Sequence, residues 1–279
     1  MAEKIDQIIP DYELLGKVGE GSYGAVYLAR SVTGQYVAVK IIYSDRMGSK
    51  TAFDREFRGV QFYEAVSRRH GGLIDILHVG RDAQRGFFFY VMDAADDERP
   101  DQPIDPATYR PRTLSSELGR RTALPIQACV DIGLDLASAL MFLQENGLVH
   151  RDIKPSNIVF VRGKLKLADI GLVADVHDAK SVVGTKGYEP PEHHGSYSGD
   201  VYSLGKLLYE VSTGRDRCNF GQAPSDEADT ADPRFARFNA IVGKACAKHV
   251  RDRYQTAKAL YKALEELKER DQASSLSES

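Results

Sequence analysis

The chain has 279 residues, of which 42% are hydrophobic and 28% charged, an ordinary mixture for a soluble globular protein. Its formal net charge is −3, so no global basic field points to a nucleic-acid partner. The three cysteines, Cys129, Cys218 and Cys246, stand far apart in the sequence. Their odd number argues against a disulfide framework and for buried, unpaired thiols in the reducing cytoplasm.

Neither the start of the chain nor its most apolar stretch is typical of a targeting or membrane segment. Residues 1–11, an N-terminal extension, contain Glu3, Lys4 and Asp6 and no long apolar run, so we expect no secretory signal. The most apolar stretch, Leu136–Leu143, is far too short to span a bilayer.

The front of the chain is rich in β-branched and aromatic runs separated by glycine-containing turn signals, which predict strands. Phe53, Phe57, Val60 and Tyr63 stand at helical spacing and predict one helix over Thr51–Arg68. The predicted strands are Tyr12–Val18, Ala25–Ala29, Tyr36–Tyr43, Leu73–Val79 and Gly86–Met92.

The pattern becomes helical after a proline-rich acidic segment, Asp96–Arg112, which we expect to be an irregular loop. The Ser-rich residues 271–279 predict a frayed tail. A strand-rich front and a helix-rich back predict an α+β protein of two lobes, each with its own core. The predicted helices are Leu124–Asn146, Val201–Thr213, Phe235–Lys248 and Thr256–Arg270.

A glycine-rich segment, Gly19-Glu20-Gly21-Ser22-Tyr23-Gly24-Ala25-Val26, joins the first two predicted strands. Glycine lets main-chain N–H groups approach a phosphate closely, so this segment is a candidate phosphate-binding loop. A dinucleotide-binding turn uses similar glycines but continues into a helix, and a flexible hairpin without function is the other alternative. Lys40, which ends the apolar strand Val37-Ala38-Val39, can place its ammonium on the α- and β-phosphates of a nucleotide.

The strongest signal is His150-Arg151-Asp152-Ile153-Lys154-Pro155-Ser156-Asn157, which matches the catalytic-loop pattern H-R-D-x-x-x-x-N. With this octet the chain resembles the eukaryotic-type (Hanks-type) serine/threonine protein kinase family over about Tyr12–Leu267. The resemblance implies that Asp152 orients the substrate hydroxyl and accepts its proton, and that Lys154 neutralises charge on the transferring phosphoryl group. Asn157 would ligate magnesium. A polar turn after a helix is the alternative without function.

The resemblance also implies a bilobal protein-kinase fold, with a small β-rich N-lobe containing one helix and a larger, mainly helical C-lobe. The N-lobe would span residues 12–92, the hinge 93–96 and the C-lobe 97–270. Lys40 would pair with a glutamate of the following helix, and we favour Glu56 over Glu64 because Glu56 has the apolar Val60 one turn on. ATP would contact Val18, Gly19, Gly21, Ser22, Gly24, Val26, Ala38, Lys40 and, at the hinge, Met92, Asp93 and Ala95.

Asp169-Ile170-Gly171 stands where the family has D-F-G, after a short predicted strand over Leu165–Ala168. Asp169 would supply the carboxylate through which Mg²⁺, for which Mn²⁺ can substitute, bridges the phosphates. Ile170 keeps an apolar plug but loses the aromatic ring. That departure puts in doubt the inactive states that depend on the ring.

Gly184-Thr185-Lys186-Gly187-Tyr188-Glu189-Pro190-Pro191-Glu192 resembles the family segment G-T-x-x-Y-x-A-P-E, which receives the substrate peptide. Pro190 replaces its alanine. By this resemblance Thr185 contacts Asp152 and Lys154, and Lys154 and Thr185 together favour serine/threonine over tyrosine acceptors.

Further residues have architectural roles by resemblance. Glu192 should pair with Arg253, and Asp200 should brace the backbone of the catalytic loop, with Tyr202 in the usual tryptophan position. One regulatory hypothesis is phosphorylation of Ser181, which would order the activation loop through Arg151. Relatives carry an additional docking helix in the region that corresponds to Cys218–Arg234, and this region looks shortened here. We expect His193-His194 to be a pair of surface histidines.

We therefore expect an ATP- and Mg²⁺-dependent kinase that phosphorylates serine and threonine hydroxyls of proteins, including its own through transient self-association. We expect no nucleic-acid partner and no membrane span. The alternative is a pseudokinase that acts as a nucleotide-binding scaffold. The pseudokinase is disfavoured because the residues that the reaction needs are all present: Lys40, Glu56, Asp152, Asn157 and Asp169. A small-molecule phosphotransferase is disfavoured because such enzymes lack the peptide-receiving segment.

Overall fold

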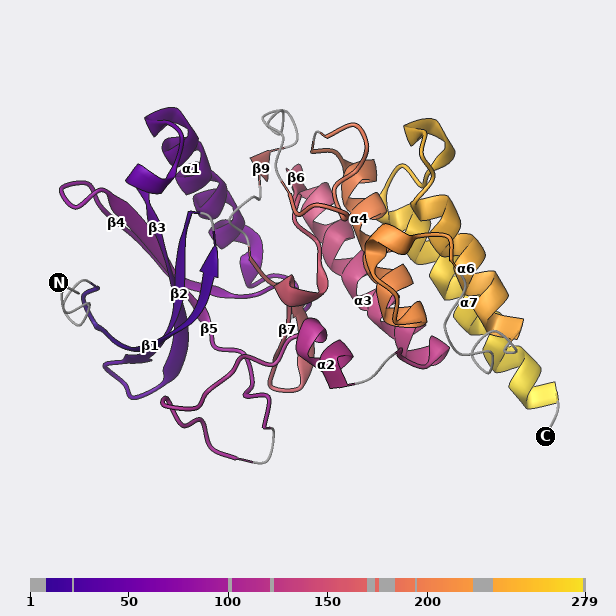
Figure 1. Ribbon diagram of the computed structural model, residues 1–279, viewed down its shortest axis with the longest axis horizontal. Helices are drawn as coiled ribbons and strands as arrows, with labels where there is room; N and C mark the ends of the chain where they lie inside the picture. Colours follow the sequence, from indigo (N-terminus) through magenta and orange to yellow (C-terminus); the bar gives the residue numbers. More distant parts are fainter. Residues whose placement is uncertain are drawn as a thin grey trace. The chain divides into compact units, whose positions relative to one another are not determined.

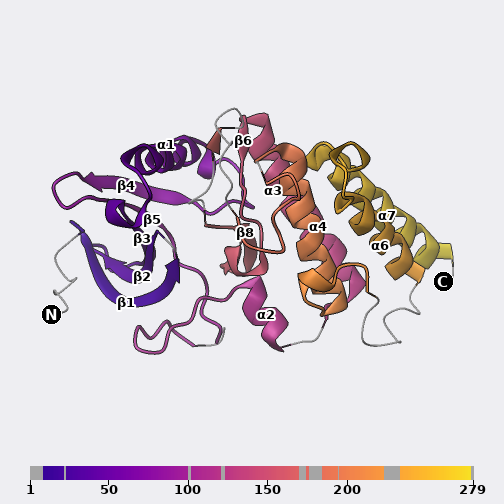
Figure 2. The same cartoon turned by 45° about the horizontal axis from the view of Figure 1, so that its top comes forward.

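The computed structural model describes residues 9–21, 23–99, 102–120, 123–169, 174–175, 184–193, 195–222 and 233–277. The chain divides into two compact units. Unit 1 comprises Met1–Thr113 and Val159–Lys166, and unit 2 comprises Leu114–Ile158 and Leu167–Ser279. Unit 1 is built around a β-sheet and unit 2 around packed helices (Figures 1 and 2). The predicted α+β class is confirmed.

Unit 1 contains a five-stranded antiparallel sheet in the order β1-β2-β3-β5-β4. Its side chains alternate between two faces, as the strand period requires. One face carries a buried cluster that includes Val37, Val39, Phe89 and Val91. The strands are β1 (Tyr12–Gly21), β2 (Gly24–Ser31), β3 (Tyr36–Tyr43), β4 (Ile76–Asp82) and β5 (Phe87–Asp93), and all five predicted strands are present.

Helix α1 (Lys50–Ser67) packs on the sheet of unit 1, as Figure 1 shows. Ser49 caps its N-terminus by accepting a hydrogen bond from the backbone N–H of Ala52 at 3.1 Å. The rings of Phe53 and Phe57 lie 5.1 and 5.2 Å from the ring of Phe88 on β5. The apolar stripe that predicted this helix is therefore the face that it buries.

The proline-rich segment after β5 is irregular, as predicted, but it belongs to unit 1. Its two ends meet, because Arg112 N–H donates to the carbonyl of Asp96 at 2.7 Å. The Asp96 carboxylate also accepts from the backbone N–H groups of Arg162 and Gly163, both at 2.7 Å. These residues turn between β7 (Ile158–Val161) and β8 (Lys164–Leu167).

Those hydrogen bonds move the boundary between the units to Thr113. The sequence placed it at the hinge, after residue 96. Residues 97–112 belong to unit 1, because the two ends of this segment are hydrogen-bonded to each other and to the β7–β8 turn. Pro100 and Asp101 lie outside the described residues.

Unit 2 is built from helices that pack on one another, with α3 in contact with α4, α6 and α7 (Figure 2). By length and composition alone, α3 is long and apolar enough to cross a membrane, a property that the core helices of folded proteins share. Its apolar side chains, among them Leu136, Leu140 and Leu143, are buried, as in the core helix of a folded unit. The main helices are α2 (Leu114–Arg120), α3 (Ile126–Glu145), α4 (Tyr197–Thr213), α6 (Pro233–Ala245) and α7 (Ala257–Ser277).

Three further sequence predictions for unit 2 need correction. Helix α2 was not predicted. Helix α7 continues to Ser277 instead of ending at Arg270, because no glycine or proline interrupts residues 271–277. Of the three unpaired cysteines, Cys129 and Cys246 are buried, but Cys218 is exposed. Cys218 belongs to the short turn η5 (Arg217–Asn219). Much of the region expected to be shortened, residues 223–232, lies outside the described part of the chain.

Candidate active site

The backbone of the catalytic loop is held by Asp200, near the start of α4. Its two carboxylate oxygens accept hydrogen bonds from the backbone N–H groups of His150 and Arg151, both at 2.8 Å. Burial raises the pKa of Asp200 and lowers the pKa of His150, whose Nε2 lies 3.1 Å from the carbonyl oxygen of Ala168. The bracing role expected of Asp200 is confirmed.

Arg151 and Asp169 have left-handed backbone conformations, which residues other than glycine rarely adopt. Arg151, before the predicted catalytic acid, has φ of +69°, and Asp169, the predicted metal ligand, has φ of +55°. Such strain persists only where the surrounding structure fixes the backbone. The hydrogen bond from Arg151 N–H to Asp200 is one such constraint.

Asp152 accepts hydrogen bonds from three side chains and is 8% exposed. The Lys154 ammonium donates to Oδ2 at 2.8 Å, and the Asn157 amide donates to the same oxygen at 2.9 Å. The Thr185 hydroxyl donates to Oδ1 at 2.7 Å and accepts from Lys154 at 2.7 Å. The contacts of Thr185 expected from the sequence are confirmed, and the structure brings Asp152, Lys154, Asn157 and Thr185 together.

The orientation of the Asn157 side chain is set by its amide nitrogen. This nitrogen donates to the backbone carbonyl of Asp152 at 2.8 Å as well as to its carboxylate. Both donor bonds go to one residue, so the amide oxygen is the atom with which Asn157 can bind a cation.

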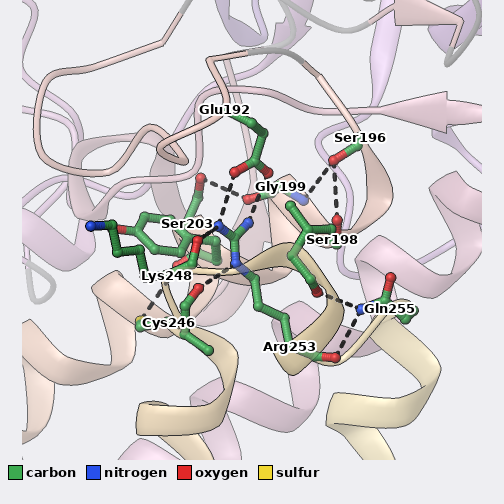
Figure 3. Close-up of polar contacts among 12 residues, drawn as sticks. Glu192, Ser196, Ser198, Gly199, Ser203, Cys246, Lys248, Arg253 and Gln255 are labelled. Carbon is green, nitrogen blue, oxygen red and sulfur yellow. Dashed lines mark hydrogen bonds and ion pairs between the residues drawn. The ribbon is translucent and has the colours of Figure 1, made fainter.

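Glu192 and Arg253 form the expected ion pair, shown in Figure 3. The guanidinium donates to both carboxylate oxygens, at 2.8 and 2.9 Å, and the side chain of Arg253 is 0% exposed. It also donates to the carbonyls of Ala247 and Lys248 and lies 4.7 Å from the ring of Tyr202. Tyr202 thus packs on the buried arginine, and each of the three guanidinium nitrogens donates to an acceptor.

Two serine side chains stabilise the start of α4, and one of them, Ser203, ties the helix to the segment around Tyr188. Ser196 caps the helix by accepting from Gly199 N–H at 3.0 Å (Figure 3). The hydroxyl of Ser203 donates to the carbonyl of Tyr188 at 2.8 Å. The helix that carries Asp200 is therefore bonded directly to the segment that carries Thr185.

In unit 1, the glycine-rich segment forms the ends of β1 and β2, with Gly19 opposite Val26 and Gly21 opposite Gly24. A Cβ atom on Gly24 would stand 1.9 Å from the carbonyl oxygen of Ile41, so the sheet itself requires glycine there. A Cβ atom on Gly21 would meet nothing within 4 Å. Packing therefore does not require glycine at position 21, and the space beside its backbone is open. Ser22 lies outside the described residues.

Lys40 lies on β3 opposite Val26 of β2 and Tyr90 of β5. Because directly paired residues share a face, Lys40 projects from the same face as Tyr90, which is also the face on which α1 packs. On α1, Glu56 is half-buried and falls on the stripe of Phe53 and Val60. This placement is consistent with the choice of Glu56, and Glu64 is half-buried as well.

The predicted hinge residues lie at the end of β5 and just after it. Lys166 of β8 reaches the carboxylates of Asp93 and Asp75, at 3.7 and 3.2 Å. Burial raises the pKa of Asp93, and the neighbouring Lys166 opposes that rise. The carbonyl of Ala95 accepts from the hydroxyl of Tyr109 at 2.8 Å. Sequence reasoning missed Lys166 and Tyr109, because a strand lysine and a loop tyrosine carry no motif.

A cavity of about 490 Å³ lies beside the hinge in the proline-rich segment. Asp97, Arg99, Tyr109 and Arg110 are among its lining residues, and none of the predicted site residues lines it. Four further sequence predictions, concerning Ile170, Gly171, Ser181 and His194, lie outside the described residues.

Comparison with known proteins gives a family and a set of relatives. A family model described as protein kinase domain matches residues 12–277. A probable serine/threonine-protein kinase of Clostridium perfringens is 30% identical over 92% of this chain and 38% of its own length. The serine/threonine-protein kinase PknB of Mycobacterium leprae is 30% identical over 88% of this chain and 41% of its own.

A third relative is the serine/threonine-protein kinase AfsK of Streptomyces coelicolor, 32% identical over 74% of this chain and 25% of its own length. The chain thus spans about two fifths or less of the length of these three relatives. The family match covers both units and includes every residue of the catalytic loop and of the glycine-rich segment. The chain belongs to the protein kinase domain family.

Proposed function

We propose that this chain is an active serine/threonine protein kinase that transfers the γ-phosphate of ATP to hydroxyl groups of protein substrates, itself among them. One observation carries the proposal. Asp152 is a shielded carboxylate on which an ammonium, an amide and a hydroxyl converge within 2.9 Å. This arrangement suits a group that must orient a substrate hydroxyl and accept its proton.

Lys154 and Thr185 have separate parts in this proposal. Lys154 is 22% exposed at its side chain and keeps an ammonium beside the proposed base, where it can neutralise charge that develops on the phosphoryl group. Thr185 links the base to the segment that receives the substrate peptide. The pair supports serine/threonine acceptors by family resemblance.

The residues fit a magnesium ion shared with a nucleotide. The amide oxygen of Asn157 can serve as one ligand atom, because its amide nitrogen donates to Asp152. The carboxylate of Asp169, which lies just after β8, would be the second ligand. Within the described ranges, no three His, Cys, Asp or Glu side chains cluster as a metal site. Mg²⁺ is commonly held by one or two protein oxygen ligands and completed by phosphates and water, so a two-ligand site is sufficient. Bound there, the ion would neutralise phosphate charge, and Mn²⁺ can replace it.

ATP itself would be bound by residues of unit 1. The backbone of Gly19 and Gly21 would approach the phosphates, and Lys40, oriented by Glu56, would pair with them. Adenine would hydrogen-bond at the hinge. Because the Ala95 carbonyl already accepts from Tyr109, we assign its N–H to the adenine, together with the carbonyl of Asp93.

Further ATP contacts are proposed at Val18, Ser22, Gly24, Val26, Ala38 and Met92.

The three cysteines form no disulfide, which supports a reducing, cytoplasmic setting.

The test is phosphate transfer from labelled ATP to a generic basic protein and to the chain itself, with Mg²⁺ present, followed by identification of the phosphorylated amino acids. Wild-type protein should label serine and threonine, and Asp152→Asn should lose more than about a hundredfold in rate. Removal of Mg²⁺ with a chelator should abolish transfer, and Mn²⁺ should restore part of it.

The same assay separates the kinase from a pseudokinase. A protein that binds ATP but transfers no phosphate, with wild type equal to Asp152→Asn, would support the nucleotide-binding scaffold. Label found on tyrosine alone would overturn the assigned acceptor class.

A further inference from the structure

The turn after α4 contacts the peptide-receiving segment through one side chain, Arg217. Its Nε donates to the carbonyl of Lys186 at 3.2 Å, and its guanidinium lies 4.7 Å from the centre of the Tyr188 ring. A Cβ atom on Gly187, whose φ is +91°, would stand 3.0 Å from Cγ and Nε of Arg217. Three consecutive residues of the segment therefore pack against one arginine.

The same arginine stands beside a partly buried carboxylate of α4, that of Glu210. The hydroxyl of Tyr188 is hydrogen-bonded to Oε2 of Glu210, and Nη1 of Arg217 lies 3.9 Å from Oε1. Burial raises the pKa of Glu210 and of Tyr188, and the nearby guanidinium opposes both effects. Arg217 thus balances the charge of the acid to which the segment is anchored.

The backbone of Arg217 is also held by side chains of α4. Its carbonyl accepts from the ammonium of Lys206 at 2.8 Å, and this ammonium lies 4.6 Å from the centre of the Phe220 ring. The hydroxyl of Tyr209 donates to the carbonyl of Asn219 at 2.6 Å. With its main chain held on the helix, Arg217 can act as a rigid strut rather than as a solvated side chain.

The other end of the held segment reaches the proposed catalytic acid. Thr185 bonds both Asp152 and Lys154, and its carbonyl accepts from the N–H groups of Tyr188 and Glu189 at 3.0 and 3.3 Å. A shift of residues 186–188 would therefore displace Thr185.

We propose that Arg217 is a positioning residue that holds the peptide-receiving segment, and through it Thr185, in the geometry needed for phosphate transfer to a peptide. The proposal rests on the proposed kinase function. It assigns a role to a residue outside every motif of the sequence. Arg217 does not touch the reacting atoms, so its loss should change the use of the peptide more than the use of ATP.

The kinetic test compares Arg217→Ala with Arg215→Ala, a neighbour whose Nη1 donates to Gln222 at 3.2 Å. For Arg217→Ala, kcat/KM for a peptide substrate should fall about tenfold or more, the cost of losing a charged hydrogen bond, with KM for ATP unchanged. Arg217→Lys should be intermediate, because it keeps the charge but not the planar contact with Tyr188. Arg215→Ala should match wild type. Wild-type peptide kinetics in Arg217→Ala would overturn the proposal.

Hydrogen exchange gives a readout that needs no activity. The amides of Tyr188 and Glu189 should exchange about tenfold faster in Arg217→Ala than in wild type, and at the wild-type rate in Arg215→Ala. Unchanged exchange in Arg217→Ala refutes the positioning role even if the wild-type protein transfers no phosphate. Faster exchange in a protein without kinase activity would instead refute the proposed function and leave the positioning role supported.

Discussion

Replacing Glu192 by glutamine leaves the shape of a buried side-chain pair almost unchanged and removes one of its two charges. The side chain of Arg253 is 0% exposed and that of Glu192 is 14% exposed. Glutamine offers one acceptor oxygen and turns an NH₂ group toward the donors of the guanidinium. The substitution therefore leaves a buried positive charge without its counter-ion.

The size of the effect follows from what Arg253 retains. Removing one partner of a buried ion pair costs about 3–5 kcal/mol. Two backbone carbonyls and the ring of Tyr202 still contact the guanidinium, so we expect the lower end, about 3 kcal/mol. For a unit of this size, that loss corresponds to a fall in melting temperature of roughly 6–12 °C.

The assay is thermal unfolding followed by far-UV circular dichroism, a signal dominated by the helices of unit 2. Glu269→Gln, an exposed position on α7, is the matched control and should change the melting temperature little. Adding Arg253→Met to Glu192→Gln should recover part of the loss, because the unpaired charge is then gone. The reasoning is refuted if Glu192→Gln melts with the control, or if the double variant is less stable than either single variant.

Gly21→Ala should leave the melting temperature unchanged and weaken ATP binding severalfold, whereas Gly24→Ala should lower the melting temperature because its Cβ meets a carbonyl at 1.9 Å; equal melting of the two variants would contradict this. Burial lowers the pKa of His150, so the unfolded chain binds more protons than the folded chain below pH about 6.5. Unfolding free energy should therefore fall as pH drops from about 7 to about 5, by at most about 1.4 kcal/mol per pH unit, and His150→Asn should show a smaller fall. Burial raises the pKa of the Cys246 thiol to about 12, so a thiol reagent should label Cys218 in the folded protein and Cys246 only after unfolding; native labelling of Cys246 would contradict its burial.

The elements that could be predicted from the sequence are those with a strong local pattern. The β-branched and aromatic run of β3 and the apolar stripe of α1 each predicted the element within one residue of its observed ends. Helix α2 was missed because Leu114–Arg120 is seven residues long, too short for a period to show. The end of α7 was misplaced because a serine-rich composition says little about a helix that continues without a breaker.

Within the candidate site, the contacts of Asp152, Asp200 and Arg253 could be predicted because these residues match family motifs. Lys166 and Arg217 could not, since a charged residue in a strand or turn reads as solvated until folding places acids or rings around it. The acids beside Lys166 are more than seventy residues away in the chain, and Lys186 and Tyr188 are about thirty residues from Arg217, so no local pattern indicates these contacts.

The proposed function requires that a bound nucleotide has its phosphates within reach of the Lys40 and Lys154 ammonium groups. An ATP derivative with an acyl group on its terminal phosphate transfers that group to lysine amines beside the bound phosphates, and mass spectrometry identifies the acylated lysines. We predict acylation of Lys40 and Lys154, suppressed by excess ATP and Mg²⁺, with the exposed Lys258 as the unprotected reference. Acylation of Lys40 and Lys154 at no more than the level of Lys258, without protection by ATP, would contradict the account.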